Sequence, residues 1–268
     1  MSKLSNKSMN WLGVIAMCIA LALASTNFVF SKYIEQGTIV VTSGPNHSEM
    51  MEARLFEDVT ECSVALLVVD GVAVSKSSGT TVFCEKNERG NYSVIVICAA
   101  HSLSETMAGV IVRFPIFNDE QVVVGEYASN GRLLDVDKKA DVALLSAETV
   151  HEARVAKLIL PETRVGVGDR VAMAGWGESG KLPITRMGRI TAKSGITSRY
   201  NIISDGRVTT DITMIPGDSG TGVFVWDKKK WRLLSISQEI YLSSTYGPVF
   251  GMSVMINPTM VQDIVLKD

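Results

Sequence analysis

Short runs of β-branched and other apolar residues recur along the chain from Ser63 onward. Polar residues and turn-forming pairs such as Asp70-Gly71 and Asn130-Gly131 separate them. Runs of this length, with no amphipathic helical pattern between them, are typical of strands in an all-β barrel or sandwich. The predicted strands are Ser63–Val69, Thr80–Cys84, Ser93–Cys98, Gln121–Val124, Val142–Leu145, Val171–Ala174, Gly222–Trp226, Leu233–Ile240 and Val249–Ile256.

The pattern becomes helical at the C-terminus. Met260, Val261, Ile264 and Val265 follow helical spacing, and Asn257 stands before Pro258 as an N-cap. We therefore expect a short helix over residues 257–267.

The first 30 residues form an apolar segment, which we expect to be helical. Residues 8–31 carry no charge, and the strongly apolar part, residues 11–24, ends in a small-x-small site at Ala22-Leu23-Ala24. Its length suits a signal peptide and falls short of the ~20 residues that span a bilayer. The alternative is an uncleaved membrane anchor that continues to Phe30. Both predict that the rest of the chain is outside the cytoplasm, whether secreted, periplasmic or held at a membrane by residues 11–30.

Residues 31–58 are mixed in character and rich in turn formers. Ser43-Gly44-Pro45-Asn46 is a turn signal, and a charged stretch follows over residues 51–58. We interpret this part as a linker or pro-segment with a short helical stretch.

Composition excludes several classes of protein. The chain is 46% hydrophobic and 20% charged, with a net charge of -2, so it is not disordered. Its longest basic run is Lys228-Lys229-Lys230, too little for a protein that neutralises nucleic-acid phosphates. The 3 histidines and 4 cysteines are scattered. We therefore expect no metal site and no cofactor.

Three segments carry chemistry. His101 ends an apolar strand, Asp141 opens another, and Ser219 lies in the glycine turn of residues 216–222. Each has an ordinary structural explanation by itself. Together they match acyl transfer, in which an imidazole base activates a serine and a carboxylate orients the imidazole.

The order His, Asp, Ser along the chain resembles the chymotrypsin/trypsin-like serine proteases. The motifs that carry the resemblance are Ala99-Ala100-His101, Asp141-Val142-Ala143-Leu144-Leu145, Gly217-Asp218-Ser219-Gly220 and, more weakly, Gly175-Trp176-Gly177. Val165-Gly166-Val167-Gly168-Asp169 and Thr210-Asp211 are similar to the HtrA-like branch. Too few residues follow Ser219 for the C-terminal PDZ domain of HtrA proteins, so we expect none.

The resemblance implies a protease domain over residues 59–268. It would consist of two six-stranded antiparallel β-barrels, about residues 59–160 and 161–256, followed by the C-terminal helix. The active site would lie between the barrels.

The resemblance also assigns roles to residues. Ser219 would be the nucleophile, His101 the general base and then acid, and Asp141 the group that orients His101. Backbone N–H groups of Gly217 and Ser219 would form the oxyanion hole. Thr213 would lie at the base of the S1 pocket, where an acidic residue would be needed to select Arg or Lys. We therefore expect a small or medium apolar P1 residue.

The strand that contains Ser235 and Ser237 would line the substrate cleft, again by resemblance. Two features depart from the family. No activation motif of the Ile-Val-Gly-Gly kind follows a basic residue, and Asp218 would still need a cationic partner, as in zymogen-activated members. Two alternatives stay open: the enzyme is made active, or it is ordered by substrate or by oligomerisation. After signal removal three cysteines remain, Cys62, Cys84 and Cys98. A Cys84–Cys98 pairing stays open, because Cys84 would face position 94 in a symmetric hairpin.

The leading hypothesis is an exported or membrane-tethered serine endopeptidase, of the EC 3.4.21 type, that acts on proteins or peptides. The alternatives are a catalytically latent binding module and an assembly protein of a surface or virion that keeps the fold. The intact His101, Asp141 and Ser219 favour the enzyme. Nothing in the sequence predicts the oligomeric state.

Overall fold

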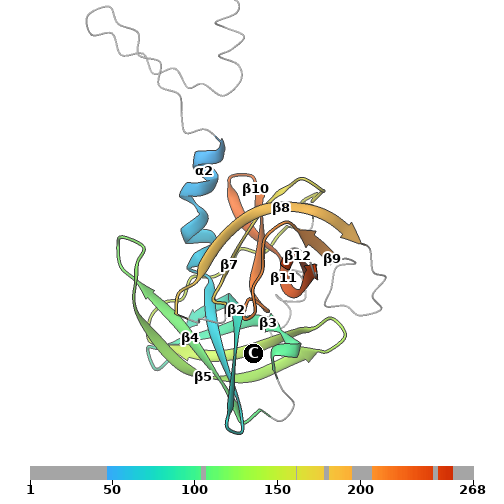
Figure 1. Ribbon diagram of the computed structural model, residues 1–268. Helices are drawn as coiled ribbons and strands as arrows, with labels where there is room; N and C mark the ends of the chain where they lie inside the picture. Colours follow the sequence, from blue (N-terminus) through green and yellow to red (C-terminus); the bar gives the residue numbers. More distant parts are fainter. Residues whose placement is uncertain are drawn as a thin grey trace, which may run out of the picture. The chain divides into compact units, whose positions relative to one another are not determined.

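The computed structural model describes residues 47–103, 107–160, 162–177, 181–194, 207–243 and 247–255. The chain divides into two compact units, Met1–Glu52 and Ala53–Asp268. Helix α2, His47–Ala53, is the described element of the first unit and ends on the first residue of the second. The second unit begins with a π-helical turn, η1, at Phe56–Thr60, and contains every strand (Figure 1).

The first six strands form a closed antiparallel barrel. Their order around the barrel is β1-β2-β3-β6-β5-β4. The strands are β1 (Ser63–Asp70), β2 (Ala73–Lys86), β3 (Tyr92–Ala99), β4 (Gly109–Phe117), β5 (Val123–Asp137) and β6 (Val142–Thr149).

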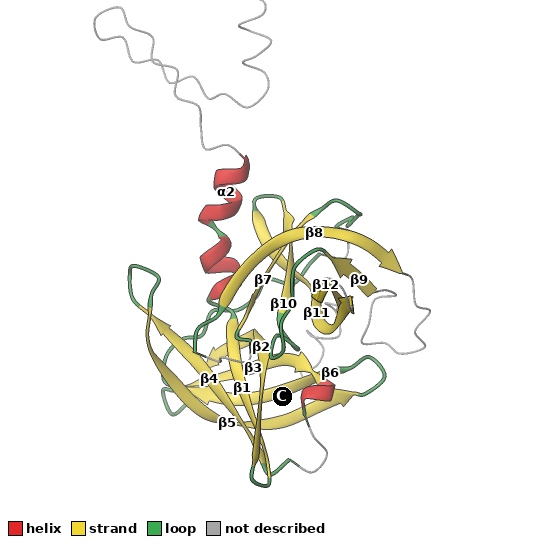
Figure 2. Ribbon diagram, in the orientation of Figure 1, coloured by secondary structure: helices red, strands yellow, loops and turns green. Residues whose placement is uncertain are grey.

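The last six strands form a second closed barrel, in the order β10-β11-β12-β9-β8-β7. The strands are β7 (Arg170–Gly175), β8 (Ile184–Ser194), β9 (Arg207–Thr210), β10 (Gly222–Asp227), β11 (Lys230–Ser243) and β12 (Gly247–Met255). Counted from its own first strand, this order repeats that of the first barrel. Figure 2 shows how strands dominate both halves. The predicted all-β fold of two six-stranded antiparallel barrels is confirmed.

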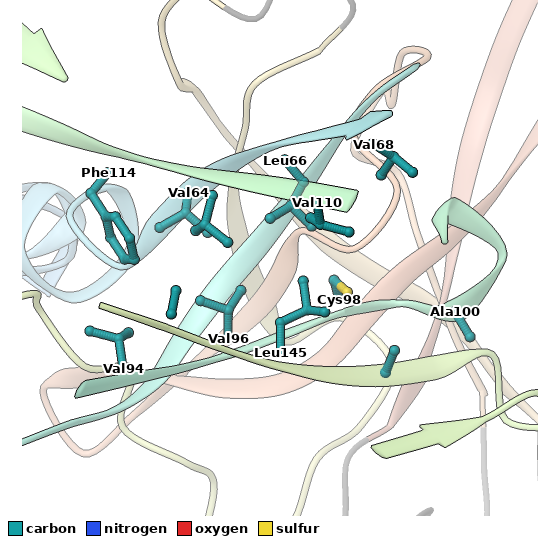
Figure 3. Close-up of a cluster of buried hydrophobic side chains, with 13 residues drawn as sticks. Val64, Leu66, Val68, Val94, Val96, Cys98, Ala100, Val110, Phe114 and Leu145 are labelled. Atoms are coloured by element: carbon teal, nitrogen blue, oxygen red, sulfur yellow. The ribbon is translucent and has the colours of Figure 1, made fainter. Parts of the chain in front are cut away.

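Alternating apolar residues fill each barrel, because successive side chains of a strand point to opposite faces. In the first barrel, β1 contributes Val64, Leu66 and Val68, and β3 contributes Val96 and Cys98, all buried (Figure 3). The core of the second barrel contains strand residues and three residues of connecting segments, Ile159, Ile212 and Met214. The strand residues are Val171, Met173, Ile190, Val208, Val223, Val225 and Leu234. Burial of each large aliphatic side chain contributes about 1.5–3 kcal/mol.

Three strands, β4, β8 and β9, were not predicted. Strand β4 carries Val110, Val112 and Phe114 in alternation, so a signal was present, although Pro115 interrupts it. The predicted turn at Asn130-Gly131 was wrong, because these residues lie inside β5 opposite Ile111 and Val110. A Cβ at residue 131 would lie 3.1 Å from the Val112 side chain, so this place in the strand favours glycine.

Several predictions lie outside the described residues. They are the apolar segment of residues 1–30 and the C-terminal helix of residues 257–267. Among the residues that are described, none of the helices combines the length and the apolar character needed to cross a membrane. The predicted linker, residues 31–58, ends in a folded part: Asp58 of η1 is buried, and its carboxylate accepts the N–H of Trp231 on β11.

Candidate active site

His101 and Asp141 are brought together by the β3–β6 ladder. Ala99, the last residue of β3, pairs with Val142, the first residue of β6, so the residues just outside the ladder lie side by side. His101 follows in a 3-10 turn, η2, at Ala100–Ser102. The Ala100 N–H donates to the Asp141 carbonyl at 3.1 Å. Strand register alone therefore places the histidine beside the aspartate.

The Asp141 carboxylate binds His101 through both of its oxygens. Oδ2 lies 2.6 Å from Nδ1 of the ring, and Oδ1 accepts the His101 backbone N–H at 2.6 Å. Because an ionised carboxylate only accepts, a neutral imidazole in this pair carries its proton on Nδ1 and has its lone pair on Nε2. This is the tautomer that a general base at Nε2 requires.

Ser219 lies in a tight turn immediately before β10. Gly217 and Gly220, on either side of it in the chain, have φ values of 91° and 88°, a region that favours glycine. A Cβ on Gly220 would collide with the Ser78 carbonyl oxygen and approach the Ala99 nitrogen to 2.9 Å. The turn therefore packs directly on the first barrel, between β2 and the end of β3.

Hydrogen bonds from β2 fix this turn. The Ser219 carbonyl accepts the Ser78 N–H at 3.0 Å and the Ser77 hydroxyl at 2.6 Å. The Ser78 hydroxyl donates to the Gly217 carbonyl at 2.8 Å. The Ser77 hydroxyl also lies 2.7 Å from the hydroxyl of Ser102, the residue after His101. A short chain of hydroxyls thus connects the backbone of Ser219 to the residue beside His101.

The N–H groups of Gly217 and Ser219 have no protein acceptor within the part of the chain that the structure describes. Two donors that are separated by one residue in a glycine turn can both bind one oxygen atom. The use of these two N–H groups as an oxyanion hole stays a prediction.

Asp218 forms a buried ion pair with Arg186 of β8. Its carboxylate is 1% exposed and meets both terminal nitrogens of the guanidinium, Nη1 at 2.7 Å from Oδ2 and Nη2 at 2.8 Å from Oδ1. Oδ2 also accepts the Ile215 N–H at 2.8 Å, and Nη1 donates to the Thr213 carbonyl at 2.8 Å. A residue of the folded chain therefore supplies the cation that Asp218 requires. No local motif in the sequence marks Arg186 as the partner of Asp218.

The residues predicted to bind substrate differ in position. Thr213 is exposed. The hydroxyl of Ser237 is buried and donates to the Asp218 carbonyl at 2.6 Å, so Ser237 lies against the turn of Ser219. Ser235 is buried in the second barrel, where its hydroxyl lies 2.8 Å from that of Ser253. A role of these three residues in substrate binding stays a prediction.

The three cysteines of the described residues are free thiols. Cys84 faces Val94, as predicted for a symmetric hairpin, whereas Cys98 faces Gly79. Burial raises the pKa of the Cys98 thiol to about 12, and the Asp141 carboxylate adds to this rise. Burial also raises the pKa of Cys62. Within the described ranges, no three His, Cys, Asp or Glu side chains are grouped to hold a metal ion.

Solved structures support the fold. The HtrA-type protease AlgW with a tripeptide matches with a TM-score of 0.55 and 18% identity, over 80% of this chain and 62% of that one. Deg5 matches with a TM-score of 0.57 and 14% identity, over 81% and 93% of the two chains. The serine endoprotease from Yersinia pestis matches with a TM-score of 0.54 and 17% identity, over 85% and 67%. At these identities the likeness shows the fold. This chain spans less than two thirds of the AlgW chain.

No curated protein matches the sequence. The trypsin-like peptidase domain matches residues 79–236, more than half of the chain, and this segment contains His101, Asp141 and Ser219. The predicted resemblance to trypsin-like proteases is confirmed, and it supports the prediction of a serine endopeptidase. The chain belongs to the trypsin-like peptidase domain family.

Proposed function

We propose that the protein is a serine endopeptidase that hydrolyses peptide bonds through an acyl-enzyme. One observation carries the proposal: the Asp141 carboxylate holds both the ring and the backbone of His101, beside a glycine turn that presents Ser219. The two barrels contribute different halves of this arrangement.

Each group has one role in acylation. Ser219 Oγ attacks the scissile carbonyl carbon while Nε2 of His101 takes the hydroxyl proton. Asp141, bonded to Nδ1, stabilises the imidazolium that forms. The N–H groups of Gly217 and Ser219 bind the oxyanion of the tetrahedral intermediate. As the intermediate collapses, Nε2 returns the proton to the leaving amine, and the acyl group stays on Ser219.

Deacylation repeats these steps with water. Nε2 of His101 removes a proton from a water molecule, which attacks the acyl-enzyme carbonyl. The second tetrahedral intermediate uses the same N–H donors. As it collapses, Nε2 returns the proton to Ser219 Oγ and the carboxylic acid leaves.

We also propose that this enzyme is made in an active form, with no proteolytic activation step. Asp218 is the residue before the nucleophile, and its carboxylate is already paired with the Arg186 guanidinium. The Ile215 N–H bond to the same carboxylate holds the preceding turn. A newly released α-amino group would find this carboxylate occupied. Comparison of the intact masses of labelled and unlabelled protein tests this, because activation by cleavage would confine labelling to a shortened chain.

The substrates proposed are proteins or peptides with a small or medium apolar P1 residue. The exposed Thr213 carries no charge that would select Arg or Lys. Hydrolysis of a peptide library, read by mass spectrometry, tests this. A preference for cleavage after basic residues would contradict it.

Location outside the cytoplasm is a separate proposal, and it rests on the apolar segment of residues 11–30 and the lysines before it. Cell fractionation with N-terminal sequencing tests it. A new N-terminus at Ser25 would indicate a cleaved signal peptide. An intact N-terminus in the membrane fraction would indicate an anchor.

The activity is tested with a fluorophosphonate probe on the full chain, beside Ser219→Ala. Labelling on Ser219 alone, and none in the variant, supports the proposal. Folded wild-type protein that is neither labelled nor able to cleave peptides, before or after limited proteolysis, contradicts it and favours a latent binding or assembly protein.

A further inference from the structure

Gln238 is a buried polar residue of β11 that the sequence analysis did not single out. It is 6% exposed and lies at a β-bulge. On the facing strand β12, Ser253 pairs with Ser237 and Met252 pairs with Glu239, so Gln238 has no partner of its own there. A bulge of this kind re-aims a side chain away from the regular alternation. Here the side chain reaches the first barrel.

The side-chain amide of Gln238 bonds the segment that carries Asp141. Its Nε2 donates to the Ala140 carbonyl at 2.6 Å and to the Asp141 carbonyl at 3.0 Å. Both partners are carbonyl oxygens, which only accept, so the amide nitrogen must be the atom that faces them. The two N–H bonds of one uncharged group thus serve two adjacent carbonyls. A serine hydroxyl has one proton, and a lysine would bring a buried charge to this place.

The backbone at Asp141 needs such support. Its φ is 57°, in the left-handed region that residues with a side chain rarely adopt, although aspartate tolerates it better than most. Strained backbone of this kind persists where the surrounding structure holds it. The Ala100 N–H holds the Asp141 carbonyl from the first barrel, and Gln238 holds it from the second.

We propose that Gln238 is a positioning residue of the second barrel that fixes the Ala140–Asp141 backbone, and through it the Asp141 carboxylate, against His101. This inference rests on the proposed function for its effect on catalysis. It assigns a new role to a residue that touches neither the substrate nor the reacting atoms. The nucleophile and the group that orients its base are thereby coupled, because β11 also holds the turn of Ser219 through Ser237.

Two other titratable groups lie near the pair and remain unchanged in the test below. Cys98 of β3 is buried and stays a neutral thiol near neutral pH, since its pKa is raised to about 12 by burial and by Asp141. Asp137, at the end of β5, accepts the N–H groups of Lys139 and Ala140. Neither is removed by a substitution at residue 238, so a change in the titration of His101 reports on Asp141.

The first test replaces Gln238 by methionine, which has a similar volume and no amide donors. We expect kcat to fall about 10- to 100-fold, as for a displacement of a catalytic group by about 1 Å, with a smaller change in KM. The acidic limb of kcat/KM should move to lower pH by at least about 0.5 unit. The reason is that a displaced carboxylate stabilises the His101 imidazolium less and its pKa falls.

A matched control separates positioning from stability. Thr60→Val removes another side-chain hydrogen bond, the part-buried one between the hydroxyls of Thr60 and Thr185, which lie 2.8 Å apart and outside the site. This variant should keep the wild-type pH profile even where it lowers the free energy of unfolding. If Gln238→Met changes only stability and leaves both kcat and the pH profile unchanged, the inference is overturned.

A second variant and a readout without substrate keep the inference testable if Gln238→Met does not fold. Gln238→Glu keeps the size of the side chain but loses the two N–H donors: an ionised carboxylate has no proton to donate, and a protonated one can donate to one of the two carbonyls only. The proton NMR signal of the His101 Nδ1–H, which is bonded to Asp141, should shift or broaden in Gln238→Glu relative to the wild type. An unchanged signal overturns the inference. A changed signal in an enzyme that does not label at Ser219 would leave the inference standing while the proposed function fails.

Discussion

The two barrels share one strand order, yet they hold their parts of the site by different means. In the first barrel, His101 and Asp141 flank one pair of hydrogen-bonded strands, so the ladder itself brings them together. In the second barrel, Ser219 lies in a turn that depends on a buried ion pair and on hydrogen bonds from the other barrel. The same topology thus supports a site by local register on one side and by tertiary contacts on the other.

Removal of the reacting groups has the largest expected effect. Ser219→Ala, His101→Ala and Asp141→Asn should each lower kcat by about 10⁴-fold or more. Because the two halves act as one unit, the double variant Ser219→Ala with His101→Ala should be no slower than the worse single variant. Kinetics on a peptide substrate measures this. Additive losses would show that the barrels contribute independently.

Removal of the buried ion pair in the second barrel has the next largest expected effect. Arg186→Met leaves the 1% exposed Asp218 carboxylate without its cation, and should lower the free energy of unfolding by about 3–5 kcal/mol. Labelling of Ser219 should fall as well, because the turn loses its anchor. Urea denaturation and probe labelling measure the two effects.

A surface ion pair provides the control for this variant. Arg154→Met breaks the pairs that the 46% exposed Arg154 side chain forms with Glu57 and Glu61, which are 53% and 31% exposed, and should cost about 1 kcal/mol or less. Equal losses from Arg186→Met and Arg154→Met would contradict the role given to burial.

The close packing of the Ser219 turn on the first barrel predicts a smaller loss of stability. Gly220→Ala introduces a side chain at a φ of 88° and against the Ser78 carbonyl. It should lower the free energy of unfolding by more than about 2 kcal/mol and abolish probe labelling of Ser219. Gly90 has a similar φ of 83° but open space around it. Gly90→Ala should therefore lower the free energy of unfolding by about 1 kcal/mol without loss of labelling. Thermal denaturation compares them, and similar losses would remove the argument for a close approach.

The smallest effect concerns the thiols. Burial raises the pKa of Cys62 and Cys98, the latter to about 12, so at pH 8 both remain protonated and enclosed. Cys84 is half-buried, and its pKa is raised by burial to a lesser extent, partly offset by a backbone hydrogen bond from Ala153. Iodoacetamide at pH 8 should therefore modify Cys84 slowly, and Cys62 and Cys98 only after unfolding. Modification of Cys98 in the folded protein would show that the first barrel opens beneath His101.

Prediction from the sequence succeeded where the signal was local. Strands such as β3 and β10 are continuous apolar runs, and the motifs around His101, Asp141 and Ser219 are contiguous in sequence. It failed for β8, in which arginine, lysine and glycine interrupt the alternation, and for β5, in which Asn130-Gly131 is typical of a turn. In both cases pairing with two neighbouring strands outweighs local preference.

The sequence by itself determined the fold class, the family resemblance and the three residues proposed to react, because alternation and contiguous motifs are local properties. Only the tertiary structure decided how the groups are held. Arg186 lies 32 residues from Asp218, and Gln238 lies 97 residues from Asp141. Their partners are a buried carboxylate and two backbone carbonyls. Such contacts depend on where barrel closure and a β-bulge place a side chain. The spacing of residues along the chain does not predict that placement.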